Sequence, residues 1–227
     1  MNIVTRSLDS LHRRGVRRSL QSTASIVGDW WFDRTHGTDT MSRLQQPDLR
    51  VDSPHQASAH AYIPTRGRAF RKLLRTLRFP PGSVFVDYGS GKGKMLMLAT
   101  EFEFRRIVGI EYAPELHGIA TENVRRLGSP RSAQIEPVCA DATTYELRDD
   151  ENVFYFFNPF AREVLEIVVE RIRESLERRP RHIWVIYFDP RFREAFSAGL
   201  GLTQTRTFTH GGYEAIVLEN GVPVQES

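Results

Sequence analysis

Three alternating glycines, Gly89, Gly91 and Gly93, stand directly after a short apolar run that ends in Asp87. A second apolar run, residues 95–99, follows them and suits a helix. A strand, a tight glycine turn and a helix in this order build the crevice in which open α/β sheets bind nucleotides. Glycine permits positive φ angles and leaves room for a ligand beside the backbone. The segment therefore predicts a nucleotide-containing ligand at the carboxyl end of a first strand.

A second acidic residue, Glu111, ends the next predicted strand, about 20 residues beyond the glycines. An acid at this place hydrogen-bonds the two ribose hydroxyls of a bound nucleotide. Its position alone also fits a nicotinamide dinucleotide. The fingerprint of dinucleotide sites is G-x-G-x-x-G, whereas this chain has G-x-G-x-G. The glycine spacing therefore argues against a dinucleotide.

With an acid, one further residue and then G-x-G-x-G, the sequence resembles the class I, seven-stranded S-adenosylmethionine-dependent methyltransferases. The resemblance continues through Asp141, after a third predicted strand, and through residues 154–160, a fourth strand and its exit loop. It covers residues 62–219. It implies an α/β fold, in which a doubly wound, mostly parallel seven-stranded sheet ends in an antiparallel hairpin. It also implies methyltransferase activity.

The resemblance implies roles around the cofactor, S-adenosyl-L-methionine. The glycine loop would pass beneath it, Glu111 would hold the ribose, and Asp141 would hold the adenine amino group. Asp87 would hold loop amides or, through water, the amino-acid end of the cofactor, and Tyr112 would pack beside the adenine. The full cofactor set is Asp87, Gly89, Ser90, Gly91, Gly93, Glu111, Tyr112, Asp141 and Ala142.

The transfer side of the site is predicted at Asn158-Pro159-Phe160. In family members that methylate nitrogen, an acid or amide followed by proline and an aromatic residue places carbonyl oxygens near the acceptor. The single proline departs from the Asn-Pro-Pro-Tyr of nucleobase and glutamine methyltransferases. Together with Tyr62-Ile63-Pro64-Thr65, the segment is similar to seven-stranded protein-lysine methyltransferases. We therefore expect a nitrogen acceptor, with a protein lysine as a candidate. The expected catalytic residues are Tyr62, Asn158, Pro159 and Phe160.

Simpler interpretations stand beside these. The glycines could form only a tight turn, Asp141 could cap a helix, and Asn158 could cap the helix that starts near Ala161. The acceptor could be a small molecule, methylated on nitrogen or oxygen beneath an aromatic lid formed by residues 30–32. The chain could also be a non-catalytic module that binds the cofactor and engages an anionic partner. The intact set of Asp87, Glu111, Asp141 and Asn158 argues against such a module.

The chain has 227 residues, 40% of them hydrophobic, which suits one domain with an N-terminal extension. We divide it into a basic extension or lid, residues 1–60, and a methyltransferase domain, residues 61–227. Cys139 is the only cysteine and the seven histidines are scattered, so neither disulfides nor a metal site is expected. No apolar run is long enough for a membrane span, and a cytoplasmic location is the default expectation.

The net charge of +3 conceals an uneven distribution, because the first 80 residues are basic and the remainder is acidic. The basic segment could lie on its own acidic domain or could attract an anionic partner such as RNA. Its basic residues lack the interleaved aromatics of a base-stacking surface, so a nucleic-acid partner is not favoured. The expected partner is the methyl acceptor itself, a protein or a small molecule.

The remaining pattern predicts a regular alternation of elements. We expect helices over 70–77, 93–104, 114–127, 161–178 and 191–198, and strands over 84–87, 106–110, 134–139, 153–157, 183–188, 203–209 and 213–218. In the extension, residues 3–20 predict a short basic amphipathic helix and residues 42–60 a loop. The cluster Trp30-Trp31-Phe32 is expected to anchor the extension on the domain.

Overall fold

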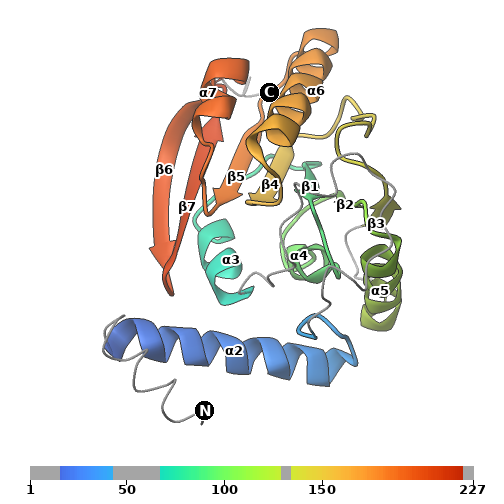
Figure 1. Cartoon of the computed structure of the whole chain (residues 1–227), viewed down its shortest axis with the longest axis vertical. Helices are drawn as coiled ribbons and strands as arrows, with labels where there is room; N and C mark the ends of the chain where they lie inside the picture. The colour runs from blue at the N-terminus through green and yellow to red at the C-terminus, as the bar shows by residue number, and fades with distance from the viewer. Residues whose placement is uncertain (1–15, 43–66, 129–133, 222–227) are drawn as a thin grey trace.

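The computed structural model describes residues 16–42, 67–128 and 134–221. Figure 1 shows a central sheet with helices on both faces, and one long helix across an end of the molecule. The elements are α2 (Val16–His36), α3 (Gly67–Leu74), β1 (Val84–Tyr88), α4 (Lys94–Ala99), β2 (Arg106–Glu111), α5 (Pro114–Leu127), β3 (Gln134–Cys139), β4 (Val153–Phe157), α6 (Arg162–Arg178), β5 (Trp184–Phe188), α7 (Glu194–Leu200), β6 (Thr203–His210) and β7 (Tyr213–Glu219).

The seven strands form one sheet in the order β3-β2-β1-β4-β5-β7-β6. The first five strands of this order are parallel, and β7 runs antiparallel to both β5 and β6. Because β2 and β4 flank β1 on opposite sides, the winding reverses at β1, and ligands of such sheets bind at the carboxyl ends of the strands there. The predicted doubly wound sheet with its antiparallel hairpin is confirmed.

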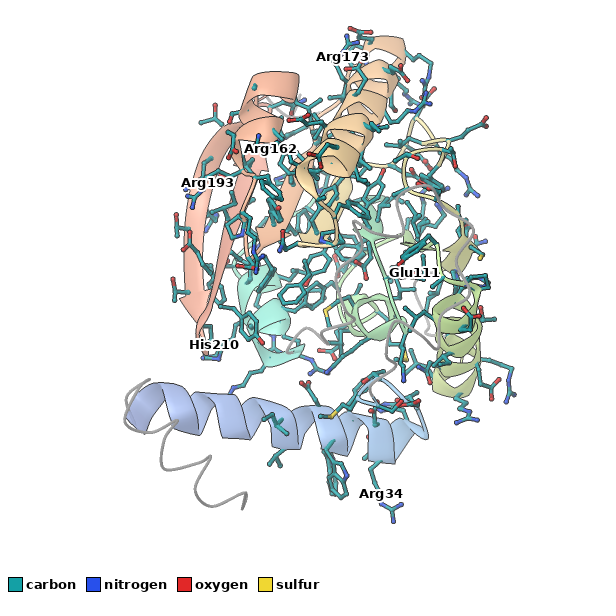
Figure 2. All side chains as sticks on the ribbon, in the orientation of Figure 1. Arg34, Glu111, Arg162, Arg173, Arg193 and His210 are labelled. Atoms are coloured by element: carbon teal, nitrogen blue, oxygen red, sulfur yellow. The ribbon has the colours of Figure 1, made fainter. Side chains whose placement is uncertain are left out.

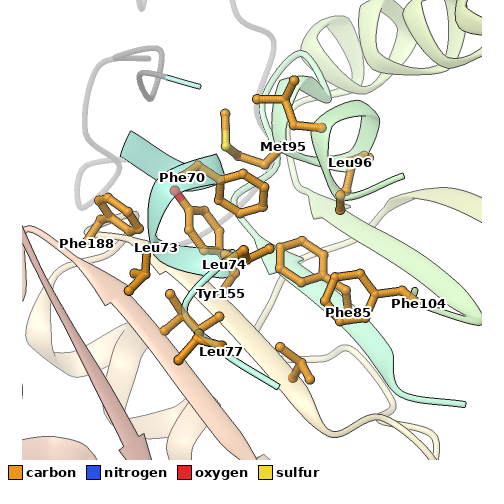
Figure 3. Close-up of a cluster of buried hydrophobic side chains, with 14 of the residues drawn as sticks. Phe70, Leu73, Leu74, Leu77, Phe85, Met95, Leu96, Phe104, Tyr155 and Phe188 are labelled. Carbon is orange, nitrogen blue, oxygen red and sulfur yellow. The ribbon is translucent and has the colours of Figure 1, made fainter. Parts of the chain in front are cut away.

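Two hydrophobic clusters, one on each face of the sheet, explain why the central strands are apolar throughout. Phe85 and Tyr155 belong to the cluster that includes α3 and α4, whereas Val84 and Val86 belong to the cluster that includes α6 and α7. Alternate residues of a strand face opposite sides, so each strand serves both clusters. Figure 3 shows the first cluster, in which Phe70 of α3 meets Phe85 and Tyr155 edge to face. With both faces covered, β1, β2 and β5 are buried along their whole length.

Most predicted elements of the domain are confirmed to within a few residues, and α4 differs most. The helix predicted over 93–104 ends at Ala99. The amide of Thr100 bonds to the carbonyl of Met97, and the turn that follows carries Phe104 into the core. The chain must enter β2 at Arg106, so Phe104 is buried by this turn and not by a helix face.

The extension contributes α2, which contains the aromatic cluster. The predicted helix over 3–20 overlaps only its first residues, and residues 1–15 lie outside the described range. Trp30 and Trp31 are 56% and 62% exposed, whereas Phe32 is 8% exposed. Successive helical residues are rotated by about 100°, so three consecutive aromatics cannot share one face. Of the three aromatic residues, only Phe32 is therefore buried against the domain.

Candidate cofactor and acceptor site

The glycine loop joins β1 to α4 and lies against the end of β2. The amides of Gly89 and Ser90 both donate to the carbonyl oxygen of Ile110, at 2.9 and 3.0 Å. Gly89, Gly91 and Gly93 have φ angles of 79°, 54° and 77°. This left-handed region is disfavoured for residues that carry a Cβ. The alternating glycines are therefore a requirement of the backbone path.

Two of these glycines also permit a close approach by another element. A Cβ on Gly93 would lie 3.1 Å from the Cβ of Ala120 in α5, and a Cβ on Gly89 would lie 2.7 Å from the Cβ of Pro159. The second contact places the Asn158-Pro159 turn directly against the glycine loop. The predicted cofactor loop and the predicted transfer turn, far apart in the sequence, are neighbours in space.

The hydroxyl of Ser90 is buried and has no hydrogen-bond partner among the described residues. A buried hydroxyl without a partner is unfavourable, and a bound ligand can supply the partner. Together with the left-handed glycines and the acid at the end of β2, this hydroxyl makes the loop a suitable cradle for the polar parts of S-adenosyl-L-methionine. The residues present therefore fit the cofactor that the sequence predicts.

Glu111 ends β2 and lies in the interior of the molecule (Figure 2), with 4% of its surface exposed. Its Oε2 accepts the amide of Gly91 at 2.8 Å and its Oε1 accepts the amide of Ala113 at 2.9 Å. Burial raises the pKa of Glu111 in spite of these bonds. A carboxylate has about four acceptor positions, so two backbone bonds leave capacity for ribose hydroxyls. Glu111 fixes the glycine loop, and its remaining acceptor positions fit the ribose-binding role that the sequence resemblance implies.

Asp87 lies where the two halves of the sheet meet. It pairs with Gly109 of β2 on one side and with Tyr155 of β4 on the other. The carboxyl is 3% exposed, and burial, followed by the charge of Glu111, raises the pKa of Asp87 well above its usual range. Asp87 is therefore an internal acid at the switch point, directly before the glycine loop.

The third acid, Asp141, follows β3 and stands near the end of β2, since Cys139 pairs with Glu111. Its Oδ1 accepts both the amide and the hydroxyl of Thr143, at 2.8 and 2.7 Å. These bonds close a turn over residues 142–144, and the described residues between β3 and β4 contain no helix, so the alternative role of Asp141 as a helix cap is wrong. Ala142 is buried beside it, while Tyr112 is partly buried, and burial and then Glu111 raise the pKa of Tyr112. The predicted ribose and adenine residues thus lie at adjacent strand ends.

Asn158 follows β4 and is 6% exposed, with a φ of 39°. Its Nδ2 donates to Oδ2 of Asp189 at 3.3 Å, and its Oδ1 accepts the hydroxyl of Tyr187 at 3.4 Å. The N-cap of α6 is Ala161, and no side chain caps that helix, so the alternative role of Asn158 as a helix cap is wrong. Phe160 packs against the cluster beneath α6. The fourth predicted catalytic residue, Tyr62, lies outside the described residues.

Sequence reasoning missed Tyr187 and Asp189, although a signal was present. The tripeptide Phe-Asn-Pro of residues 157–159 returns as Phe-Asp-Pro at residues 188–190. Both tripeptides stand at the ends of apolar runs that predict buried strands. Comparing the exits of neighbouring strands would have drawn attention to Asp189.

The described part of the extension reaches the site through a lysine of the glycine loop. Lys92 is fully buried, and its Nζ lies 3.0 Å from Oδ2 of Asp39 and also contacts the hydroxyl of Ser42. The side chain of Asn123 in α5 bonds to both the amide and the carbonyl of Asp39, at 2.9 and 3.1 Å. We refer to residues 37–42, held in this way against the loop and α5, as the latch.

A second buried pair fastens α2 itself. Nζ of Lys94 lies 2.9 Å from Oδ1 of Asp29, which also accepts the amide of Gly67 at 3.3 Å. Burial lowers the pKa of Lys94, although the neighbouring Asp29 opposes the shift. The extension is therefore joined to the domain by buried polar contacts in addition to Phe32. Pairs so distant in the sequence leave no local pattern, and the sequence did not predict them.

Within the described ranges, no group of three or more His, Cys, Asp and Glu side chains is placed to hold a metal ion. Of the helices that the structure describes, none combines the length and the apolar character needed to cross a bilayer.

Comparison with known proteins places this geometry in context. No protein-family model matches the chain. A curated relative, the adenine nucleotide translocase lysine N-methyltransferase of Mus musculus, is 28% identical over 167 residues, 72% of this chain and 69% of the relative. A SAM-dependent methyltransferase from Aquifex aeolicus has a TM-score of 0.50 at 15% identity and covers 66% of this chain and 88% of its own. One from Leishmania major has a TM-score of 0.53 at 12% identity, covering 68% and 71%.

At these low sequence identities, the two solved structures show a similarity of fold alone. The overall fold that they share with this chain, together with the sheet order and the positive-φ glycine loop described above, agrees with the fold that the sequence resemblance implies. The chain therefore has the seven-stranded Rossmann-like fold of the class I S-adenosylmethionine-dependent methyltransferases.

Proposed function

We propose that this methyltransferase uses S-adenosyl-L-methionine to methylate a nitrogen, the side-chain amine of a protein lysine. The observation that carries the proposal is the contact between Gly89 and Pro159, which joins the glycine loop to the Asn-Pro turn. A cofactor cradled by that loop would present its reactive end beside Asn158.

The cofactor supplies an electrophilic methyl group on a sulfonium. The task of the chain is to align a nucleophile with that methyl group. A neutral amine attacks through its lone pair, so its hydrogens must be held by acceptors on the other side. The side-chain and backbone oxygens at Asn158-Pro159 are such acceptors, and the proline fixes their direction. Glu111, together with Asp141 and Tyr112, would hold the nucleoside in this arrangement.

A lysine acceptor is supported by the curated relative, which is named as a lysine N-methyltransferase. The alternative of a small-molecule enzyme was based on an aromatic lid formed by residues 30–32. It is weakened because Trp30 and Trp31 lie on α2 with most of their surface exposed. The contact of Asn158 with Asp189 also provides a negatively charged neighbour for a basic acceptor.

The test is to find where the methyl group goes. Extract from cells that lack this protein is incubated with the purified protein and methyl-labelled cofactor, and the protein, RNA and small-molecule fractions are separated. We expect label in the protein fraction, as methyllysine after hydrolysis, and much less label with Asn158→Ala. Label on oxygen or carbon, or full activity of Asn158→Ala, would contradict the proposal.

A further inference from the structure

Two neighbouring strands of the sheet end in the same way. In the parallel pair of β4 and β5, Phe157 is paired with Phe188. The next residues are therefore side by side at the carboxyl edge of the sheet, and they are Asn158 and Asp189. Each is followed by a proline. The carboxyl edge next to the switch point is where ligands of this type of sheet bind.

Both residues have an unusual backbone conformation. The φ angles are 39° for Asn158 and 49° for Asp189, and in the described part of the chain no other residue except glycine has a positive φ. Asn and Asp tolerate this region better than other residues with a Cβ, but it is still disfavoured. Such conformations persist where the surroundings hold them, and they are concentrated at functional sites.

The two side chains form one polar unit with different exposure. Asn158 is buried, and its amide is oriented from both ends, by Asp189 at the nitrogen and by Tyr187 at the oxygen. The Asp189 side chain is 48% exposed. A group that approaches from solvent can therefore reach the carboxylate of Asp189, whereas the Asn158 side chain lies behind it.

The counter-ion of Asp189 is one that a ligand can replace. Nε of Arg191 lies 3.1 Å from Oδ2 of Asp189, and the Arg191 side chain is 59% exposed. Ion pairs between such exposed groups contribute little stability. A basic group that arrives in the correct geometry can displace Arg191 without disturbing the core.

We propose that Asp189 is the acceptor-binding residue of this enzyme, the anionic subsite that selects a basic amine as methyl acceptor. The inference rests on the proposed function and deepens it. In the reaction the nitrogen lone pair forms the N–C bond while the C–S bond breaks, and the electron pair of that bond neutralises the sulfonium. Positive charge thus moves from sulfur to nitrogen, beside the Asp189 carboxylate, and the proton of the resulting ammonium leaves to solvent. A fixed negative charge at this place favours the charge that develops during transfer.

The experiment uses two probes that need no knowledge of the natural acceptor. Both are analogues of the demethylated cofactor in which a nitrogen replaces the sulfur and carries a short alkyl chain, ending in a primary amine in one probe and in a methyl group in the other. We expect wild-type protein to bind the amine-ended probe about tenfold or more tightly, as a close charge pair at a partly desolvated site allows. In Asp189→Asn, which keeps the shape and an oxygen for Asn158, the preference should fall below about threefold.

Asp149→Asn is the matched control. The Asp149 side chain is also exposed, at 42%, and paired with an arginine. Asp149 precedes β4, however, and therefore lies at the opposite edge of the sheet. This variant should keep the preference. The ratio of the two affinities cancels any loss of cofactor binding common to both probes, so a merely structural role of Asp189 would leave the ratio unchanged. A preference that survives in Asp189→Asn, or one that is absent from wild-type protein, overturns the proposal.

This result is separable from the test of function. If the labelled extract shows methyllysine but the preference does not depend on Asp189, the subsite is wrong and the function stands. If the preference depends on Asp189 but no nitrogen is labelled, Asp189 binds amines beside the cofactor, and the proposed function and the role of Asp189 in selecting the acceptor both fall.

Discussion

The two halves of the carboxyl edge of the sheet differ in how their polar side chains are held. At β1 and β2, Asp87 and Glu111 are almost fully buried, and Glu111 is tied to two backbone amides. At β4 and β5, Asn158 and Asp189 adopt disfavoured backbone conformations, and the Asp189 carboxylate is open to solvent. The first half is a preformed internal cradle, and the second is a strained pair of which only Asp189 is accessible to solvent. This difference suits one half for an invariant cofactor and the other for an acceptor that comes and goes.

The substitution expected to break both halves together is Gly89→Ala. The new Cβ would stand at a φ of 79° and would lie 2.7 Å from the Cβ of Pro159, so the glycine loop and the Asn-Pro turn must separate. The conformational strain alone is about 1–2 kcal/mol, and the clash adds to it. We expect loss of detectable binding of the demethylated cofactor in calorimetry and a lower midpoint of urea unfolding.

Gly82→Ala is the control, because Gly82 has a similar φ of 83° but has open space where its Cβ would stand. Gly82→Ala should lower the midpoint of urea unfolding through backbone strain alone, and it should still bind the demethylated cofactor. Equal loss of binding in both variants would show that the Gly89–Pro159 contact is unimportant.

The next largest effect is expected from Asp39→Ala in the latch. This change leaves the fully buried Lys92 without its carboxylate, and an unsatisfied buried donor costs about 1–3 kcal/mol. Because the latch touches the loop of the cofactor half, affinity for the demethylated cofactor should fall with stability. Glu170→Ala, which removes a carboxylate from an exposed ion pair on α6, should change the free energy of unfolding only slightly. Similar losses of stability and of cofactor affinity in the two variants would mean that the latch contributes no more than an exposed ion pair.

The latch also predicts a pH dependence. Burial tends to raise the pKa of Asp39. Hydrogen bonds from Ser42 and Lys92 outweigh this effect and hold the pKa of Asp39 below its usual value of 3.8. A carboxyl with a lowered folded-state pKa stabilises the protein fully above its unfolded pKa, and this contribution is lost as the pH falls through the folded value. The difference in unfolding free energy between wild type and Asp39→Asn should therefore be constant at neutral pH and should shrink below about pH 4. A difference that grows on acidification would contradict the assignment.

The smallest effect is expected from deletion of residues 1–28. We propose that residues 1–60 cover the pocket or bind substrate, and that Phe32 is their contribution to the core cluster. Asp29 and Phe32, which fasten α2 to the domain, remain after this deletion, and Ile26 and Val27 in the removed segment are exposed. The shortened protein should unfold cooperatively and bind the demethylated cofactor. Loss of cooperative unfolding would show that the segment is structural.

How far the sequence could predict this molecule depends on the range of each interaction. The glycine loop was predictable because left-handed φ angles need glycine at fixed local positions, and the strands because burial on both faces leaves continuous apolar runs. The helix α2 was not predicted around Trp30, since most of its large apolar residues there are exposed and only Phe32 faces the domain.

The missed parts of the site depend on pairings that no local pattern records. Lys92 and Asp39 are 53 residues apart, and Asn158 and Asp189 are 31 apart. Their contacts exist only after the sheet and the extension have assembled. Even Pro159, which sequence reasoning placed at the site, could not be predicted to touch Gly89 without the strand order.

The central claim is the division of the carboxyl edge into a cofactor half and an acceptor half. Calorimetric titration of the demethylated cofactor into wild type, Glu111→Ala and Asn158→Ala tests it most directly. Loss of the charge-assisted bonds of Glu111, each about 1.5–3 kcal/mol, should weaken binding about tenfold or more, while Asn158→Ala should bind within about threefold of wild type. Wild-type affinity in Glu111→Ala, or a larger loss in Asn158→Ala than in Glu111→Ala, would contradict the division.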